Sequence, residues 1–162
     1  MVEAYIDSTP TLVTTMYRKL FVPVDGSELS QRAMQNSIEL AHQLGASIFG
    51  FVVEPDAPFP VEGMQMSNYE RDTAAHISRT DTHAHELLSN FQEQAARGKV
   101  DFSGLHVQTG NIGQAIADHA AEQECDMIVM VTHGRGVFGE LLFGSQPKSV
   151  LGRSKLPLLI LH

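Results

Sequence analysis

The stretch DMIVMVTHGRGVFGELLFGS, residues 126–145, decides the fold of this chain. It opens with the apolar run MIVMV (127–131), which is rich in β-branched residues and typical of a strand covered on both faces of a parallel sheet. Glycines follow at positions 134, 136 and 139, and Pro147 then stands where the first turn of a helix favours proline. A strand, a glycine-rich loop and a helix start predict an anion-binding loop, because glycines let backbone N–H groups approach a phosphate and a helix N-terminus adds unpaired donors.

The charge of this part of the sequence agrees with an anion-binding loop. Residues 127–162 hold four basic residues and one acid, which gives +3 within a chain of net charge −8. The alternative is an ordinary loop whose glycines serve turns alone. The spacing of the glycines does not by itself separate these two interpretations.

The composition is that of a globular domain, with 43% hydrophobic and 19% charged residues in 162. A sequence pI near 5.4 argues against a nucleic-acid binder, because phosphate backbones need a basic face. The single cysteine, Cys125, excludes an internal disulfide, suits a reducing cytosol and directly precedes the strand, where we expect it to be buried and unreactive. No apolar run approaches membrane-spanning length, so a membrane partner is not expected.

The first fifteen residues differ from the rest of the chain. They carry Glu3 and Asp7 and lack the basic start and continuous apolar run of a secretory signal. We expect residues 1–15 to be a flexible tail and residues 16–162 to form a single domain, located in the cytoplasm.

Strands and helices alternate along the sequence. Strands are predicted at 19–25, 46–53, 102–108, 127–131 and 156–161, and helices at 28–44, 69–97, 112–124 and 147–153. This pattern predicts an α/β fold with an open five-stranded parallel sheet in the flavodoxin-like or Rossmann-like order 3-2-1-4-5, with helices on both faces. The order reverses between the first and fourth strands, so Asp25 and the glycine-rich loop should meet at one crevice.

The sequence resembles one known family at two places. His133-Gly134, nine further residues and then Gly144-Ser145 resemble the G-x-x-G-x9-G-[S/T] signature of the universal stress protein (UspA) family. The segment VPVDGS (22–27) resembles the first strand and turn of that family, and the resemblance spans residues 16–162 in the family's order of elements. The signature departs at Val131, where the family has its first glycine.

The resemblance implies a cytoplasmic stress-response protein that binds an adenine nucleotide, with ATP, alone or with Mg²⁺, as the expected ligand. Asp25 would face the adenosine, and Pro23 and Val53 would border the adenine. The alternative role of Asp25 is to accept hydrogen bonds from backbone donors at the helix entry. The nucleotide-binding residues implied are Pro23, Asp25, Val53, Met130, Val131, His133, Gly134, Arg135, Gly136, Gly144, Ser145 and Gln146.

The sequence offers little support for an enzyme. It lacks a G-x-S-x-G elbow, a Walker A lysine pattern and a carboxylate cluster for a catalytic magnesium, so at most slow ATP hydrolysis is expected. His83 and His85 stand two residues apart and would point to different sides of a helix, so a metal site is not expected.

Two functions remain open. Val131, Gln146 and Pro147 each reduce the room or the donors of a phosphate site, so a nucleotide-free dimeric interaction module of the same family is the alternative to a nucleotide binder. In either case the apolar segment Leu156–Leu161 would be an edge strand, and we expect a homodimer through it, with further protein partners unknown.

Overall fold

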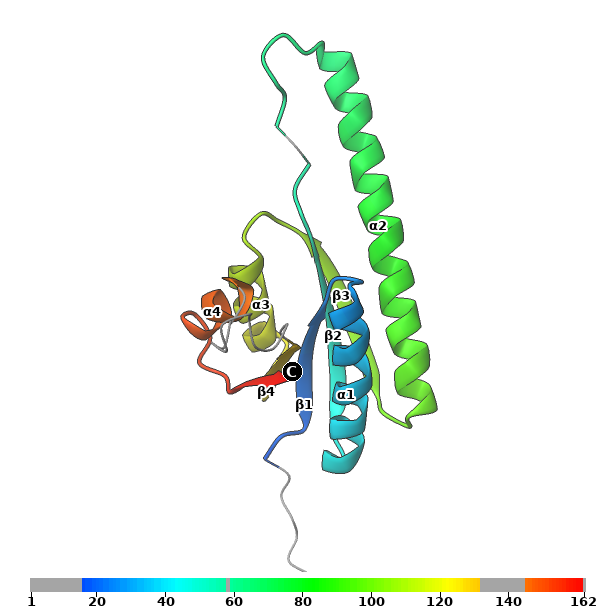
Figure 1. Cartoon of the computed structure of the whole chain (residues 1–162), viewed down its shortest axis with the longest axis vertical. Coiled ribbons are helices and arrows are strands. Elements are labelled where there is room, and N and C mark those ends of the chain that lie inside the picture. Colours follow the sequence, from blue (N-terminus) through cyan, green and yellow to red (C-terminus); the bar gives the residue numbers. More distant parts are fainter. Residues whose placement is uncertain (1–15, 58, 132–144, 162) are drawn as a thin grey trace, which may run out of the picture.

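The computed structural model describes residues 16–57, 59–131 and 145–161. Five strands and four helices alternate along the described chain (Figure 1): β1 (Lys19–Val24), α1 (Glu28–Leu44), β2 (Ser47–Glu54), α2 (Met66–Arg97), β3 (Phe102–Gln108), α3 (Ile112–Glu122), β4 (Met127–Val131), α4 (Ser145–Leu151) and β5 (Leu158–Leu161). The expected tail, residues 1–15, lies outside the described residues.

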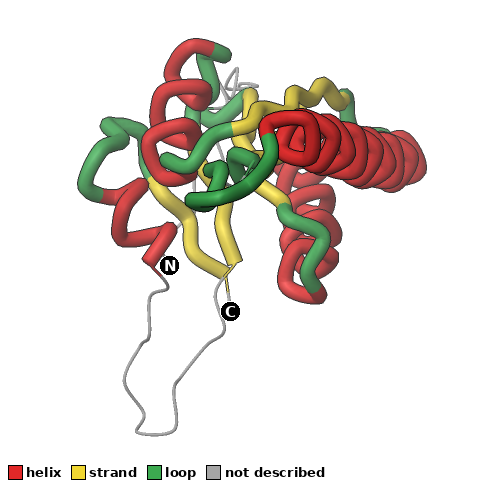
Figure 2. Tube along the Cα trace, turned by 90° about the horizontal axis from the view of Figure 1, so that it is seen from above, coloured by secondary structure: helices red, strands yellow, loops and turns green. Residues whose placement is uncertain are grey.

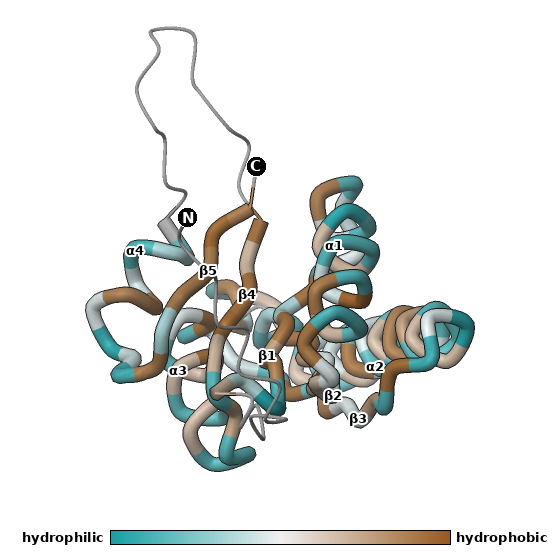
Figure 3. The backbone as a smooth tube through the Cα atoms, turned by 90° about the horizontal axis from the view of Figure 1, so that it is seen from below, coloured by the Kyte–Doolittle hydropathy of each residue, from teal (hydrophilic) through white to brown (hydrophobic). Residues whose placement is uncertain are grey.

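The five strands form one parallel sheet in the order β3-β2-β1-β4-β5, which confirms the predicted fold. Helices α1 and α2 cover one face of the sheet, and α3 and α4 cover the other (Figure 2). The strands are the apolar centre between these layers, while the outer sides of the helices are hydrophilic (Figure 3). In the part of the chain that the structure describes, no helix combines the length and apolarity needed to cross a bilayer.

Each face of the sheet carries its own core. On the α1 and α2 side, Leu20, Val22 and Met34 are fully buried with Phe91. On the α3 and α4 side, the fully buried residues include Phe21, Phe51, Ile128 and Val150. Because buried residues alternate between the two faces along β1, the side chain of every second residue of that strand points to the same core.

Helix α1 has the ends that the sequence predicts. Ser27 is its N-cap, and the Ser27 hydroxyl accepts a hydrogen bond from the backbone N–H of Ser30 at 3.2 Å. Gly45 ends the helix in the left-handed conformation, with φ at +63°. The cap fixes where the chain leaves β1 and therefore positions Asp25 at the C-terminal end of that strand.

A pair of glycines lets α2 approach the sheet closely. Gly50 in β2 lies opposite Gly104 in β3, and a Cβ at Gly50 would stand 2.7 Å from Cζ of Phe102. The Phe102 ring in turn packs on Phe91 of α2, with ring centroids 5.0 Å apart. Glycine is therefore required here for space and not for its backbone conformation.

Several boundaries differ from the sequence prediction. Helix α2 begins at Met66, three residues before the predicted start. Residues 66–68 are polar or exposed and carry no apolar period, so the sequence did not mark them as helical. Strand β5 begins at Leu158, two residues late, because Pro157 has no N–H to donate to a neighbouring strand. Helices α3 and α4 each end two residues earlier than predicted.

Candidate functional site

The candidate site is the crevice at the C-terminal ends of β1 and β4, where the strand order reverses. Strand β1 pairs with β2 along its whole length, from Lys19 to Val24. Its pairing with β4, by contrast, covers Leu20 and Phe21 in the described chain. The ends of β1 and β4 therefore part, which is the geometry in which open α/β sheets bind ligands.

Asp25 follows β1 at one wall of this crevice. Its Oδ1 accepts hydrogen bonds from the Ser27 N–H at 3.0 Å and from the Ser30 hydroxyl, while the Asp25 N–H donates to Ser30 Oγ at 2.7 Å. Desolvation alone would raise the pKa of Asp25, but hydrogen bonds from Ser27 and Ser30 outweigh it and hold the pKa below its ordinary value. The result is a carboxylate that stays ionised.

The two interpretations of Asp25 are compatible in this geometry. Oδ1 serves the helix entry, which is the structural role. Oδ2 accepts no hydrogen bond from the described residues, and Asp25 is exposed at the C-terminal end of β1. One carboxylate oxygen is therefore available to accept a hydrogen bond from a ligand hydroxyl or amine.

The apolar residues that the resemblance assigns to the adenine lie on one face of the sheet. Met130 is buried within the α3 and α4 core, and Val53 packs against the same core. Pro23 lies two residues after Phe21 in β1 and so faces the same side. These three residues therefore share the α3 and α4 face of the sheet, where Pro23 and Val53 remain half-buried.

Val131 faces the opposite side. It ends β4, pairs with Leu161 of β5 and packs half-buried against the α1 and α2 core. The valine therefore makes a core contact in addition to occupying the position where the family has glycine. Its replacement would disturb packing as well as the crevice.

The second wall of the crevice is the start of α3 and α4. Gly113 of α3 packs directly on α4, because a Cβ at Gly113 would stand 2.6 Å from Cβ of Ser149 and 3.6 Å from Oε1 of Gln146. Gln146 is half-buried in the first turn of α4, and Pro147 beside it is buried. The position of the first turn of α4 is thus set by its contact with α3.

Part of the predicted anion-binding loop lies outside the described residues. This holds for His133, Gly134, Arg135, Gly136 and Gly144. Ser145 starts α4, and its side chain is likewise outside the described part. The remaining predicted residues divide between the two faces of the sheet: Val53 and Met130 belong to the α3 and α4 side, whereas Val131 packs on the α1 and α2 side. Pro23 and Asp25 lie at the end of β1, and Gln146 lies in the first turn of α4.

The structure adds two residues near Asp25: Glu54, which the sequence did not single out, and His83, which was considered there only as a metal ligand. Glu54 ends β2 and is nearly buried, with 12% of its side chain exposed, and its Oε1 lies 2.6 Å from Nδ1 of His83 in α2. Because a carboxylate only accepts, the proton lies on Nδ1. The His83 ring covers Gly26, where a Cβ would stand 2.8 Å from Nε2. The pair thus supports the turn that carries Asp25.

No sequence pattern could have paired Glu54 with His83, which are 29 residues apart. The contact of Ser30 with the Ser27 cap could have been predicted from the sequence, since Ser30 stands three residues after Ser27. Gly113 also carried a signal, because a glycine within a helix lowers helix stability and usually has a packing reason.

The remaining histidines and the cysteine do not add to the site. His106 Nε2 lies 3.0 Å from Asp81 Oδ1 on the α2 side of β3, and His85 packs edge-on against His106. Within the described ranges, no three histidine, cysteine or acidic side chains are grouped to hold a metal ion. Cys125 is buried as predicted, and burial raises its pKa to about 11, which keeps the thiol protonated.

Comparison with known proteins places the fold and the crevice in context. The model of the universal stress protein family matches residues 16–162. A universal stress protein of Methanocaldococcus jannaschii is 25% identical over 150 residues, which cover 90% of this chain and 82% of the relative. A protein of the same family from Burkholderia pseudomallei has a crystal structure that matches with a TM-score of 0.73 at 20% identity, covering 90% of this chain and 96% of the other.

Two further solved structures contain nucleotides. One is a universal stress protein in complex with cAMP, with a TM-score of 0.62 and 25% identity, covering 90% of this chain and 97% of that one. The other is the universal stress protein of Archaeoglobus fulgidus in complex with dAMP, with a TM-score of 0.58 and 19% identity, covering 91% and 99%.

Proposed function

The chain belongs to the universal stress protein family, and from this premise we propose that it binds an adenine nucleotide, ATP in particular, in the crevice between β1 and β4. The observation that carries the proposal is the hydrogen bonding of the Asp25 carboxylate. Its Oδ1 is held by Ser27 and Ser30 at the point where the strand order reverses, and its Oδ2 is free of the described residues. An ionised carboxylate with one available oxygen suits the hydroxyl groups of a ribose.

Two further features support an adenine nucleotide. Pro23, Val53 and Met130 lie on one face of the sheet, and the half-buried Pro23 and Val53 would give a purine ring apolar contact. The helix start at Ser145, preceded by the glycines of the loop, would supply N–H donors for phosphates. The two solved relatives with cAMP and dAMP bind ligands that share the adenosine part.

We further propose that the protein acts by binding and not by fast turnover, in the cytoplasm, as a homodimer through the segment Leu156–Leu161. Strand β5 is at the edge of the sheet, and its four residues are each half-buried in the single chain. An apolar edge strand favours pairing with a second copy. At most slow ATP hydrolysis is proposed, because the crevice offers Asp25 but no second described carboxylate bonded to it.

Calorimetric titration with ATP, with and without Mg²⁺, tests the nucleotide proposal. Asp25→Ala should weaken ATP binding by about tenfold, because a charge-assisted hydrogen bond contributes roughly 1.5 kcal/mol or more. The matched control is Asp101→Ala, which removes an exposed carboxylate at the opposite edge of the sheet and should leave affinity unchanged.

The anion-binding loop needs its own variants. Gly144→Ala and Ser145→Ala should each weaken ATP binding, since the first adds a Cβ where backbone must approach a phosphate and the second removes a hydroxyl. If both variants bind ATP as the parent does, the phosphates lie elsewhere. If the parent itself binds no nucleotide and releases none on denaturation, the nucleotide proposal is wrong and the nucleotide-free interaction module replaces it.

A further inference from the structure

Apart from His83, which supports the turn that carries Asp25, the N-terminal part of α2 and the loop before it do not contribute to the proposed nucleotide site. We define the α2 arm as residues 59–86. Figure 1 shows that the arm projects beyond the C-terminal ends of the strands. Among the described residues of α2, none from 66 to 83 is buried, whereas Ala84, Leu87, Phe91 and Ala95 are. Packing against the sheet therefore stabilises the helix from Ala84 onward and leaves residues 66–83 without a buried side chain.

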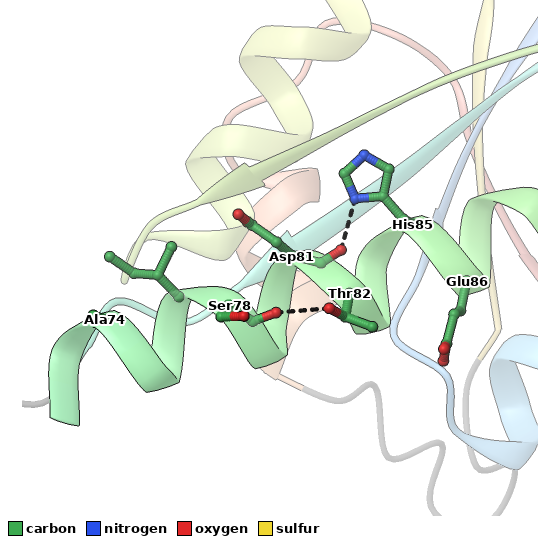
Figure 4. Close-up of a pocket in the computed structure, with 7 residues that line it drawn as sticks. Ala74, Ser78, Asp81, Thr82, His85 and Glu86 are labelled. Atoms are coloured by element: carbon green, nitrogen blue, oxygen red, sulfur yellow. Dashed lines mark hydrogen bonds between the residues drawn. The ribbon is translucent and has the colours of Figure 1, made fainter. Parts of the chain in front are cut away.

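Hydrogen bonds within the arm are mainly local. The Thr82 hydroxyl donates to the backbone oxygen of Ser78 at 2.8 Å (Figure 4), and the Thr80 hydroxyl donates to that of His76 at 3.1 Å. Polar contacts at the surface tie the part of the arm nearest the sheet to the fold: His76 Nε2 lies 3.1 Å from the backbone oxygen of Pro55, and His83 and Asp81 contact Glu54 and His106. No such contact involves the described residues 59–75. Helical turns without buried side chains are marginally stable in water, so residues 66–83 have stability to gain from a partner.

Exposed apolar side chains are concentrated on the arm. In the described part of the chain, seven large hydrophobic side chains are exposed, and five of them belong to the arm: Phe59, Val61, Met64, Met66 and Ile77. Phe59 is 88% exposed. Scattered apolar side chains are normal on a protein surface, but such a concentration on one projecting element is typical of an interaction site. The two methionines can adapt to the shape of a partner.

The arm also has a charge of one sign. It holds five carboxylates against two arginines, which gives −3 with histidines neutral. A shallow groove of about 740 Å³ lies along the arm, with Ala74 and Ile77 as its apolar residues and Asp81 and Glu86 as its acids (Figure 4). Asp81 also lies 3.0 Å from Nε2 of His106 in β3, whereas its side chain stays 51% exposed. A second copy of the chain would bring two arms of −3 together, so the charge favours a basic partner.

We propose that the α2 arm binds a basic amphipathic helix of a partner protein. The apolar side of that helix packs on Ile77 and Met66, and its lysines or arginines pair with Asp81 and Glu86. This is the mode in which an apolar helical face is recognised through residues at helical spacing, with charge setting specificity. Binding covers the exposed apolar side chains and buries part of residues 66–83, which the sheet leaves unburied.

The probe for this proposal is an 18-residue labelled peptide of leucine and lysine, with the leucines at helical spacing, and the readout is fluorescence anisotropy with the full chain. The same peptide with glutamate in place of lysine is the charge control. The lysine peptide should bind with a micromolar dissociation constant, and binding should weaken as salt rises from about 50 to 300 mM. Hydrogen exchange should show new protection at residues 66–83 and none in α1.

Matched variants locate the binding surface. Ile77→Ser should weaken peptide binding by about fivefold or more, while Leu151→Ser, which removes an exposed leucine of α4, should have no effect. Glu86→Gln should weaken binding by about twofold to threefold, whereas Glu39→Gln, on the exposed side of α1, should not. Circular dichroism and thermal unfolding confirm that each variant is folded.

Three outcomes overturn the proposal. The glutamate peptide could bind as well as the lysine peptide, or the control variants could lose as much affinity as the arm variants. Alternatively, Ile77→Ser could lower the oligomeric state of the free protein in sedimentation, in which case a second copy occupies the arm.

Discussion

The contact between Gly113 and Ser149 allows a direct test of how packing positions the proposed phosphate site. A Cβ at Gly113 would stand 2.6 Å from Cβ of Ser149, and ordinary contact begins at 3.4 Å. The Ser149 Cβ is fixed to its backbone and cannot turn away as the end of a long side chain could. Gly113→Ala therefore has to move α4 from α3 by roughly 0.8 Å, the difference between these distances, and the first turn of α4 moves with it.

The expected magnitudes follow from this displacement. Overpacking costs roughly 1–3 kcal/mol, and alanine returns up to about 1 kcal/mol through its better helix propensity, so the free energy of unfolding should fall by about 1 kcal/mol. Hydrogen bonds from the start of α4 to a phosphate would lengthen and lose roughly 1 kcal/mol. The dissociation constant for ATP should then rise about fivefold to tenfold.

Urea unfolding and ATP titration of the same samples measure both effects. The double variant with Gly113→Ala and Ser149→Gly removes the obstructing atom and should recover ATP affinity, although glycine in α4 keeps the stability low. Gly152→Ala is the control, because a Cβ there makes ordinary contact at 3.6 Å. If Gly113→Ala leaves stability and affinity unchanged, α4 does not depend on this contact. A double variant that binds no better than Gly113→Ala would refute the link between packing and the site.

Four further predictions concern other parts of the fold. Gly50→Ala should lower the free energy of unfolding by about 2 kcal/mol in urea, because the new Cβ meets the Phe102 ring at 2.7 Å. Asp25→Asn should lower the free energy of unfolding by about 1 kcal/mol near pH 7. The difference between the two proteins should be full above the ordinary carboxyl pKa of 3.8 and should disappear as pH falls through the lower pKa of the folded protein. Urea unfolding of both proteins between pH 3 and 7 measures it. Ile160→Lys should give a monomer in sedimentation, because Ile160 lies on the edge strand and outside both core clusters of the described residues; a dimer would place the interface elsewhere. Val131→Gly should lower the free energy of unfolding by about 2 kcal/mol, because it removes a core contact. It should nevertheless tighten ATP binding several-fold, by about 1 kcal/mol, and weaker binding would mean that the valine supports the site.

The architecture could be predicted from the sequence because strands of a parallel sheet are buried on both faces. The run at Met127–Val131 and the one at Ser47–Glu54 are almost continuously apolar, and such runs are recognised without knowledge of their partners. The start of α2 could not be predicted in the same way. Residues 66–83 of α2 lack a buried stripe, so no helical period marks where the helix begins.

The surroundings of Asp25 were predictable only where the residues involved are close in sequence. Asp25 follows a strand and precedes a capped helix, so its location follows from two local signals. The support of that turn by Glu54 and His83 depends on where α2 crosses the end of β2, and a contact between residues 29 apart leaves no periodic trace. The role of Gly113 depends likewise on the angle at which α4 meets α3, which no local pattern encodes.

The two walls of the crevice belong to different packing layers. Asp25 is held by the cap of α1 and supported from α2, on one face of the sheet, whereas Gln146 is positioned through α3 and α4 on the other. Between these walls, β1 and β4 share only the described pairs at Leu20 and Phe21. A ligand that contacts both walls would therefore supply a link that the sheet itself lacks at this edge. Because a ligand that binds the folded state alone stabilises it by mass action, such a link would raise resistance to unfolding as well as fill the site.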